Sequence, residues 1–379
     1  MNESYREKNM TTISYAAYDA ATQMGTSPGD AAALLLNKVE IRKFKDVLLM
    51  FADEDGLKEL LIQELCANDA ERKRASVDKK VRGWVSGKNQ PTAREDLLEL
   101  CFVLRLNAEQ ADTFLTRVSD EGLHWRNPRE LVFAFALNHG IKYIEACELY
   151  DRVNPEQARE ESETESFTPL IRQEVQNCKT EDELRKYLSR MSGKLGKMHN
   201  SAYQQFMAMM QVLEMPQSLN ESDERRYSTR EIVEKYLDKR LPTVREGKNL
   251  EEKKRCILAD WPDEIALSRM KNRKADITRK TLVLLFLATD GGDSYSDEDW
   301  YDADEEQESD ADAAFRSSYM RLNQMLVNCG YGMLDPRNAF DWIVIYCMRV
   351  ENESVSIDGL NERLSHVLEV LFDTAASDD

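Results

Sequence analysis

The sequence has few glycines and prolines and no long hydrophobic run. Its 379 residues include 15 glycines and 9 prolines, about half the usual share, which disfavours folds rich in strands and turns. The longest unbroken apolar runs, among them 282–288 and 342–348, have seven residues each, against the roughly 18 that a membrane-spanning helix needs. The start, MNESYREKNMTT, lacks the apolar segment of a secretion signal. These absences predict an all-α, cytoplasmic protein with no membrane insertion.

Signatures of catalysis and of metal binding are also missing. The four histidines form no HxxxH or HExxH pair, and the chain has no glycine-rich phosphate loop. The seven cysteines are widely spaced without a CxxC pair, which indicates a reducing compartment rather than a disulfide framework or a zinc ribbon. We therefore expect no enzyme, no metal and no cofactor. The cysteines are Cys66, Cys101, Cys147, Cys178, Cys256, Cys329 and Cys347.

Hydrophobic spacing and charge divide the chain into segments. Apolar residues recur at helical spacing from Leu34 to Leu65. The stretch 156–166 is acidic and poor in apolar residues, as is typical of a linker. The expected organisation is an N-terminal arm (1–37), a first helical module (38–153), an acidic linker with a helical middle (154–227), a second module (228–352) and a C-terminal helix with a tail (353–379).

Two parts of the chain resemble each other. Residues 87–103 align with 272–288 at an offset of 185, which places Arg94 on Arg279. Further on, GLHWRNPR (122–129) aligns with GYGMLDPR (330–337) at an offset of 208. The difference of 23 residues equals the length of 290–312, which holds twelve acidic and no basic side chains. We therefore predict a duplicated helical module with an acidic insertion in its second copy.

The first copy resembles the XRE, or lambda-repressor-like, helix-turn-helix family from Ser76 to Leu115. The shared features are an aromatic residue and Gly-Lys at the end of a short helix, a Pro-Thr loop and a Leu-rich helix, here Trp84, Gly87, Lys88, Pro91, Thr92, Leu97, Leu98, Leu104, Leu106 and Leu115. The resemblance implies that 76–85 is a DNA-recognition helix and that both modules are helix-turn-helix-like. The chain departs from the family where 67–75 separates this helix from the preceding one, and the second copy is degenerate near Arg269 to Ala288.

Positive charge gathers at equivalent places in both copies. The whole chain carries a net charge of −19, whereas 72–94 carries +7 and 269–280 carries +5. Such basic stripes are typical of surfaces that neutralise phosphates. Lys79 and Arg82, with Asn89 or Gln90, could also reach base edges. The predicted DNA-binding residues are Arg72, Lys73, Arg74, Lys79, Lys80, Arg82, Lys88 and Arg94 in the first stripe, and Arg269, Lys271, Arg273, Lys274, Arg279 and Lys280 in the second.

The sequence thus favours a DNA-binding protein, a bacterial transcriptional regulator in which tandem modules read two half-sites. The competing interpretation is a non-enzymatic scaffold for protein partners, of the kind that accompanies mobile elements or phage defence, which keeps the fold without reading DNA. The net acidity and the degenerate second copy favour this alternative. The two differ in one measurable property, because only DNA binding should weaken steeply as salt is raised.

Overall fold

The computed structural model describes residues 12–69, 71–91, 93–153, 168–192, 195, 200–215, 226–239, 241–242, 250–289, 310–349 and 359–372. Within these ranges the chain is helical, and its β-structure is limited to an isolated bridge between Glu121 and Tyr331. The predicted all-α class is confirmed. The predicted linker 156–166 and residues 290–309 of the predicted insertion lie outside the described residues.

The chain folds into two compact units that do not follow the predicted module boundaries. Unit 1 combines 1–41, 202–329 and 333–379, whereas unit 2 consists of 42–201 and the short segment 330–332. The predicted helical middle is divided between the two units. Each unit has its own hydrophobic core.

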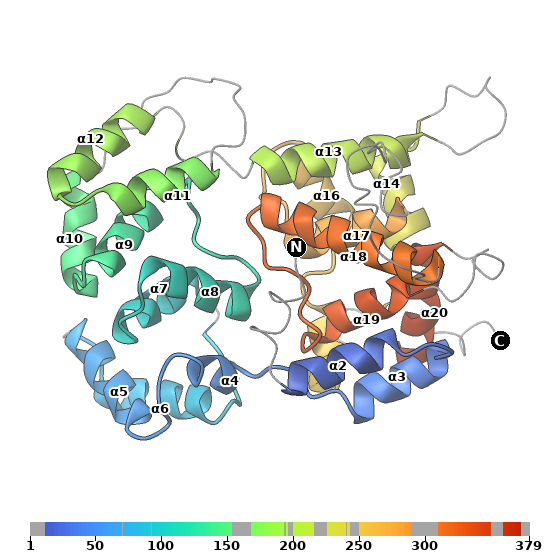
Figure 1. Ribbon diagram of the computed structural model, residues 1–379, viewed down its shortest axis with the longest axis horizontal. Coiled ribbons are helices and arrows are strands. Elements are labelled where there is room, and N and C mark those ends of the chain that lie inside the picture. The colour runs from blue at the N-terminus through green and yellow to red at the C-terminus, as the bar shows by residue number, and fades with distance from the viewer. Residues whose placement is uncertain are drawn as a thin grey trace. The chain divides into compact units, whose positions relative to one another are not determined.

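Unit 2 is built around two helices that are buried on all sides. Every residue from Leu97 to Val103 and from Glu130 to Leu137 is buried. These central helices are α7 and α9 (Figure 1). Helices α5, α8, α10, α11 and α12 pack directly on them, and α4 and α6 pack on α8 and α5. The helices of unit 2 are α4 (Phe44–Leu48), α5 (Leu57–Ala67), α6 (Arg74–Val85), α7 (Arg94–Val103), α8 (Ala108–Ser119), α9 (Pro128–Asn138), α10 (Tyr143–Val153), α11 (Thr168–Asn177) and α12 (Glu181–Met191).

Unit 1 has the same kind of core. All residues from Thr281 to Leu287 and from Ala339 to Met348 are buried, and these stretches belong to α17 and α19 (Figure 1). The helical elements of unit 1 are α2 (Thr12–Thr22), α3 (Pro28–Asn37), α13 (Asn200–Glu214), α14 (Thr229–Ile232), the π-helix η2 (Val233–Leu237), α15 (Glu252–Leu258), α16 (Glu264–Lys271), α17 (Arg279–Ala288), α18 (Asp310–Asn328), α19 (Ala339–Met348) and α20 (Leu360–Phe372).

Residues 12–37 pack into unit 1, so the prediction of a weakly packed arm is wrong for them. Helix α2 packs on α19, and α3 packs on α20. The Trp342 indole donates a hydrogen bond to the Ala17 carbonyl at 2.8 Å, and the Tyr346 hydroxyl donates one to the Thr26 carbonyl at 2.8 Å. The buried faces of α2 and α3 consist largely of alanines, whose small side chains gave no strong hydrophobic signal in the sequence.

Candidate nucleic-acid interface

Helix α6, the predicted recognition helix, has one buried and one exposed face. Val77, Val81 and Trp84 are buried, and the Trp84 ring meets the edge of Phe44 at a centroid distance of 6.3 Å. Because Val77, Val81 and Trp84 recur every three or four residues, they form a single stripe that packs against α5 and α4. The opposite side, which includes Lys79 and Arg82, is exposed. This is the orientation that the sequence predicted.

The connection between α5 and α6 is longer than in a tight helix-turn-helix. Helix α5 ends at Ala67 and α6 begins at Arg74, which leaves six residues between them. The two helices nevertheless pack closely against each other. The sequence departure at 67–75 therefore lengthens the turn without separating the two helices.

The exposed face of α6 carries cations that are free or only weakly paired. Lys73, Lys79 and Lys88 are exposed and form no ion pair with another described residue. The side chains of Arg82 and Lys80 are 68% and 59% exposed and pair with Asp78 and with Asp96 (3.7 Å), and Arg74 pairs with Glu59. Exposed pairs of this kind contribute at most about 1 kcal/mol. A phosphate could therefore replace these carboxylates at little cost.

Arg72, whose side chain is 33% exposed, is held by contacts within unit 2, which disfavours its predicted DNA contact. Its Nη1 donates to both carboxylate oxygens of Glu99, at 2.7 and 2.9 Å, and to the Leu65 carbonyl at 3.3 Å. The Asn68 amide donates to the same carboxylate at 3.0 Å. Because Glu99 is only 1% exposed, Arg72 provides its charge partner and fastens the end of α5 to α7.

Glu99 should make unfolding depend on pH. Burial raises the pKa of this carboxyl above its ordinary value of 4.5, against the opposing hydrogen bonds from Asn68 and Arg72. An acid whose pKa is raised on folding stabilises the folded state below its unfolded pKa, and this contribution is lost as pH rises through the folded pKa. Glu99→Gln keeps an acceptor but does not titrate. In urea titrations from about pH 4 to about pH 7, the unfolding free energy of the wild type minus that of Glu99→Gln should fall; a constant difference would contradict the assignment.

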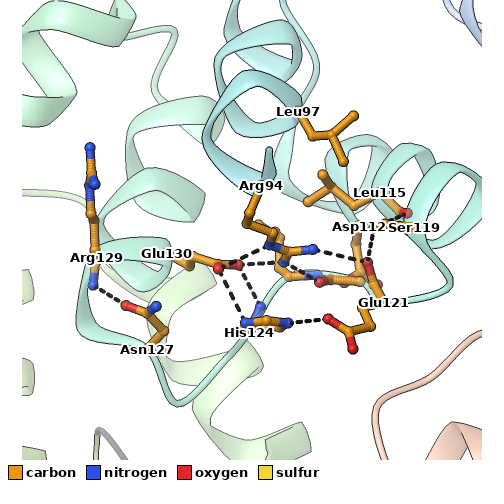
Figure 2. Close-up of polar contacts among 12 residues, drawn as sticks. Arg94, Leu97, Asp112, Leu115, Ser119, Glu121, His124, Asn127, Arg129 and Glu130 are labelled. Carbon is orange, nitrogen blue, oxygen red and sulfur yellow. Dashed lines mark hydrogen bonds and ion pairs between the residues drawn. The ribbon is translucent and has the colours of Figure 1, made fainter. Parts of the chain in front are cut away.

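Arg94 is a structural residue of unit 2 rather than a DNA contact (Figure 2). Its guanidinium donates to the Glu130 carboxylate at 2.7 and 3.2 Å and to the Gly122 carbonyl at 2.5 Å. The Glu130 carboxylate also accepts from the His124 backbone N–H at 2.7 Å. Figure 2 shows the His124 ring between Glu130 and Glu121, at 3.3 and 3.1 Å. Arg94 thereby ties α7 to the α8–α9 connection and to the first turn of α9.

Arg279 forms the same kind of contact in unit 1 and is likewise removed from the predicted DNA-binding set. It is 5% exposed, and both of its terminal nitrogens donate to the Asp341 carboxylate at 2.8 Å. It also donates to the Met333 carbonyl at 3.1 Å, and Asp341 accepts from the Asp335 N–H at 2.8 Å. A buried ion pair satisfied in this way is not available to a phosphate.

The contacts of Arg94 and Arg279 follow one pattern at a register that differs from the predicted one. Arg94 corresponds to Arg279 at the predicted offset of 185, but the contacts made by α8 and α9 recur in α18 and α19 at an offset of 211 rather than 208. Each matched contact joins corresponding residues in the two units. Gly122 corresponds to Met333 and Glu130 to Asp341, and all four accept hydrogen bonds from the arginine of their unit. Asn127 corresponds to Asn338, and these are the N-cap residues of α9 and α19. Asp112 corresponds to Asn323, and their side chains accept from the backbone N–H groups of Leu123 and Leu334. Duplication of whole modules stays a prediction.

The ends of α6 and α16 also match. After α6, the Gly87 N–H donates to the Trp84 carbonyl and the Lys88 N–H to the Gly83 carbonyl, both at 3.0 Å. This pair of bonds is a Schellman motif, which places Gly87 in the left-handed region, at φ 70°. After α16, the Arg273 and Lys274 N–H groups form the same two bonds, at 3.0 and 2.7 Å, with Arg273 at φ 54°.

Most of the second basic stripe is occupied by contacts within unit 1. Lys271 pairs with Glu214 at 2.6 Å, and the Arg273 guanidinium lies 4.1 Å from the centre of the Tyr203 ring. The Lys280 amine donates to the Cys256, Ile257 and Ala259 carbonyls at the end of α15. Arg269 and Lys274 stay exposed and line a shallow depression. Its other lining residues are Glu264, Ile265, Ser268 and Asn272.

Two lysines next to α6, Lys43 and Lys45, were not predicted from the sequence to belong to the cationic face. A Cβ atom built on Gly87 would lie 3.3 Å from Cδ of Lys43 and 3.5 Å from Cβ of Lys45. The start of α4 therefore lies against the end of α6, and it adds lysines to the cationic face. The run RKFK at 42–45 was the available signal, but nothing in the sequence connects it with residues 87–88.

Gly87 should tolerate alanine poorly. Its φ of 70° strains any other residue, and the added methyl group would press on Lys43. We expect Gly87→Ala to lower the unfolding free energy by about 1 kcal/mol, measured by urea denaturation. Gly83→Ala is the control for the added methyl group, because Gly83 lies inside α6 and has no positive φ. Its Cβ would lie 2.9 Å from the Asn89 amide nitrogen, so that side chain has to move aside. The control should lose less stability than Gly87→Ala, because a helical backbone favours alanine over glycine. Equal losses for both variants would contradict this explanation.

Lys239 is a buried lysine whose hydrogen bonds lie within unit 1. Burial lowers the pKa of Lys239 in unit 1 to about 8, but its amine donates to the Ser365 hydroxyl at 2.8 Å and to the Asn361 carbonyl at 3.4 Å. No group of three or more histidine, cysteine, aspartate or glutamate side chains among the described residues could hold a metal ion. His199 lies outside the described residues.

Comparisons with known proteins return no relatives. No family model matches the chain, and neither a curated protein nor a solved structure matches it. Among the described helices, none combines the length and the apolar character needed to cross a membrane. The resemblance of 76–115 to XRE-like proteins therefore rests on its residues alone.

Proposed function

We propose that the protein binds DNA through the exposed face of α6, as a transcriptional regulator of the XRE-like kind. The observation that carries this proposal is the division of α6 into a buried apolar stripe and an exposed cationic face, in a chain whose net charge is −19. A cationic helix face on an acidic protein is favoured where a polyanion has to be attracted locally. Lys79 lies on the exposed face, and Asn89 lies beside α6 over Gly83. These two side chains are the ones we expect at base edges.

The two units are not equivalent in this proposal. Unit 2 presents the cations of α6, whereas in unit 1 Lys271, Arg279 and Lys280 form internal contacts and the exposed Arg273 stacks on Tyr203. We therefore assign the main DNA contact to unit 2 and no longer propose that two half-sites are read by similar surfaces. The compartment proposed is the cytoplasm, which agrees with the seven free cysteines.

The salt dependence of binding tests the proposal. About four phosphate contacts on α6 should make the affinity for a random duplex fall about 100-fold between 50 and 200 mM salt. Fluorescence anisotropy of a labelled duplex, titrated with the full chain at several salt concentrations, measures this slope. Lack of binding at the lowest salt would overturn the proposal.

The scaffold alternative gains support from unit 1. There Lys271, Arg279 and Lys280 are used in internal contacts, and α16 exposes Ile265, which is 70% accessible, in the depression that Arg269 and Lys274 also line. A module that keeps this fold while its cations are used internally fits a role in protein binding. A chain that does not bind DNA would make this alternative the preferred one.

A further inference from the structure

Helix α16 of unit 1 exposes an isoleucine that the rest of the unit does not cover. Ile265 lies in the first turn of α16 and is 70% exposed, more than any other large hydrophobic residue that the structure describes. The core-facing residues of the same helix, Leu267 and Met270, are buried. A single exposed isoleucine is common on a protein surface, so its meaning depends on the groups around it.

Two cations without a counter-charge lie in the same depression as Ile265, which has a volume of about 270 Å³. Arg269 and Lys274 are exposed and form no ion pair with another described residue. Because Ile265 and Arg269 are four residues apart, they share one face of α16. After the helix, Arg273 is left-handed at φ 54°, and the Lys274 N–H donates to the Arg269 carbonyl at 2.7 Å. This turn keeps Lys274 beside Arg269.

The rest of the lining favours a peptide over a nucleic acid. Glu264 adds a carboxylate to the depression, which repels the phosphates that follow one another along a DNA or RNA strand. The Asn272 amide nitrogen donates to the Ser268 carbonyl at 2.7 Å, which leaves the amide oxygen to accept a peptide N–H. An apolar side chain, two cations, a carboxylate and an amide together match the mixed groups of a polypeptide.

We propose that this depression binds an acidic segment of a partner protein, with a large apolar side chain of the partner on Ile265 and its carboxylates at Arg269 and Lys274. Positions 265 and 269 are about 6 Å apart along α16, and an extended chain advances about 3.3 Å per residue. The partner segment therefore places Asp or Glu about two or three residues from an aromatic or aliphatic residue. Partner binding at α16 goes beyond the proposed DNA binding and does not depend on it, because α6 belongs to unit 2.

Selection of short random peptides from a display library on the full chain tests the proposal. Peptides that bind the wild type but neither Ile265→Ser nor Arg269→Gln with Lys274→Gln should pair Asp or Glu with a large apolar residue at the spacing given above. The matched controls are Ile144→Ser, at an exposed isoleucine of unit 2, and Arg226→Gln with Arg255→Gln, at exposed arginines of unit 1. Each control should bind the same peptides as the wild type.

Fluorescence anisotropy with one selected, labelled peptide gives the size of each effect. Ile265→Ser should weaken binding about tenfold, because the apolar contact is lost. Arg269→Gln with Lys274→Gln should weaken it about tenfold at low salt, and this loss should shrink as salt is raised. Both variants change exposed side chains, so they should unfold in urea at the wild-type midpoint.

Three results would overturn the proposal. The first is a selection without peptides that depend on Ile265, or with peptides that lack the acidic and apolar pair. The second is a DNA duplex whose affinity falls in the Arg269 and Lys274 variant as much as that of the peptide, which would assign these cations to nucleic acid. The third is dimerisation of the wild type that Ile265→Ser abolishes in sedimentation velocity, which would assign the depression to a second copy. The first and third results leave DNA binding by α6 unchanged.

Discussion

Asp341→Ala is expected to lower the free energy of unfolding of unit 1 by about 3–5 kcal/mol, because it leaves the Arg279 guanidinium buried without its counter-charge. The Asp341 side chain is fully buried and Arg279 is 5% exposed, so water cannot replace the lost carboxylate. Asp341 also accepts the Asp335 N–H in the turn before α19. The substitution therefore removes a charge partner and a backbone acceptor at the centre of the unit.

Urea denaturation followed by tryptophan fluorescence measures this effect, since Trp342 lies in α19. Asp276→Ala is the control for loss of a negative charge, because Asp276 is exposed, and we expect its effect to stay within about 0.5 kcal/mol. The pair Arg279→Met with Asp341→Leu should recover most of the loss, because no charge is then buried. A change below about 1 kcal/mol for Asp341→Ala would show that the pair does not hold unit 1 together.

The corresponding variant in unit 2, Glu130→Ala, should have a smaller effect. Arg94 is 25% exposed at its side chain, against 5% for Arg279. Water can therefore partly solvate the guanidinium after its carboxylate is removed. Comparison of the two variants measures how much of the cost comes from burial.

Reversing two charges on α6, Lys79→Glu with Arg82→Glu, is expected to reduce duplex affinity at least about 100-fold at low salt. Each replacement removes a phosphate contact and adds repulsion, and both side chains are exposed, so the fold of α6 is preserved. The slope of log affinity against log salt should fall by about 1.8, which corresponds to the loss of two phosphate contacts. Anisotropy titrations against the same labelled duplex measure both quantities.

Arg269→Glu with Lys274→Glu is the matched control for this charge reversal. Both residues are exposed and belong to the second predicted stripe. If unit 2 makes the main DNA contact, this control should weaken binding much less than the α6 variant. Equal losses would mean that both stripes bind, as the sequence alone suggested, and a loss confined to the control would place the DNA on unit 1.

The parts of the structure that sequence predicted well are those set by local periodicity. The low content of glycine and proline favoured helices, and the spacing of Val77, Val81 and Trp84 identified the buried face of α6. Both properties are decided within a few residues of the chain. Tertiary packing did not alter them.

The failures concern partners that are distant in sequence. Arg94 and Glu130 are 36 residues apart, and Arg279 and Asp341 are 62 apart, so counting charges along a stripe could not show that these arginines form internal ion pairs. The same holds for Lys43, whose proximity to Gly87 depends on how α4 packs. Local net charge is a property of the sequence, whereas availability of that charge is a property of the fold.

The register of the predicted repeat failed for a related reason. Alignment by identity matched the Gly and Pro-Arg residues at an offset of 208, but these belong to a connection whose length can vary. The contacts align at 211, where Asn127 and Asn338 cap the following helices and Glu130 and Asp341 take the acidic position three residues later. Helix caps and the charge partners of Arg94 and Arg279 thus define the correspondence better than the turn residues do.

Photo-crosslinking from α6 tests the central claim most directly. A photoreactive residue at Ser76, on the exposed face of α6, should form a covalent adduct with a bound duplex, and the yield should fall as salt is raised. The same probe at Glu148, exposed on α10, should give little adduct. Binding of duplex without any adduct from position 76, or equal adducts from both positions, would contradict DNA recognition by α6.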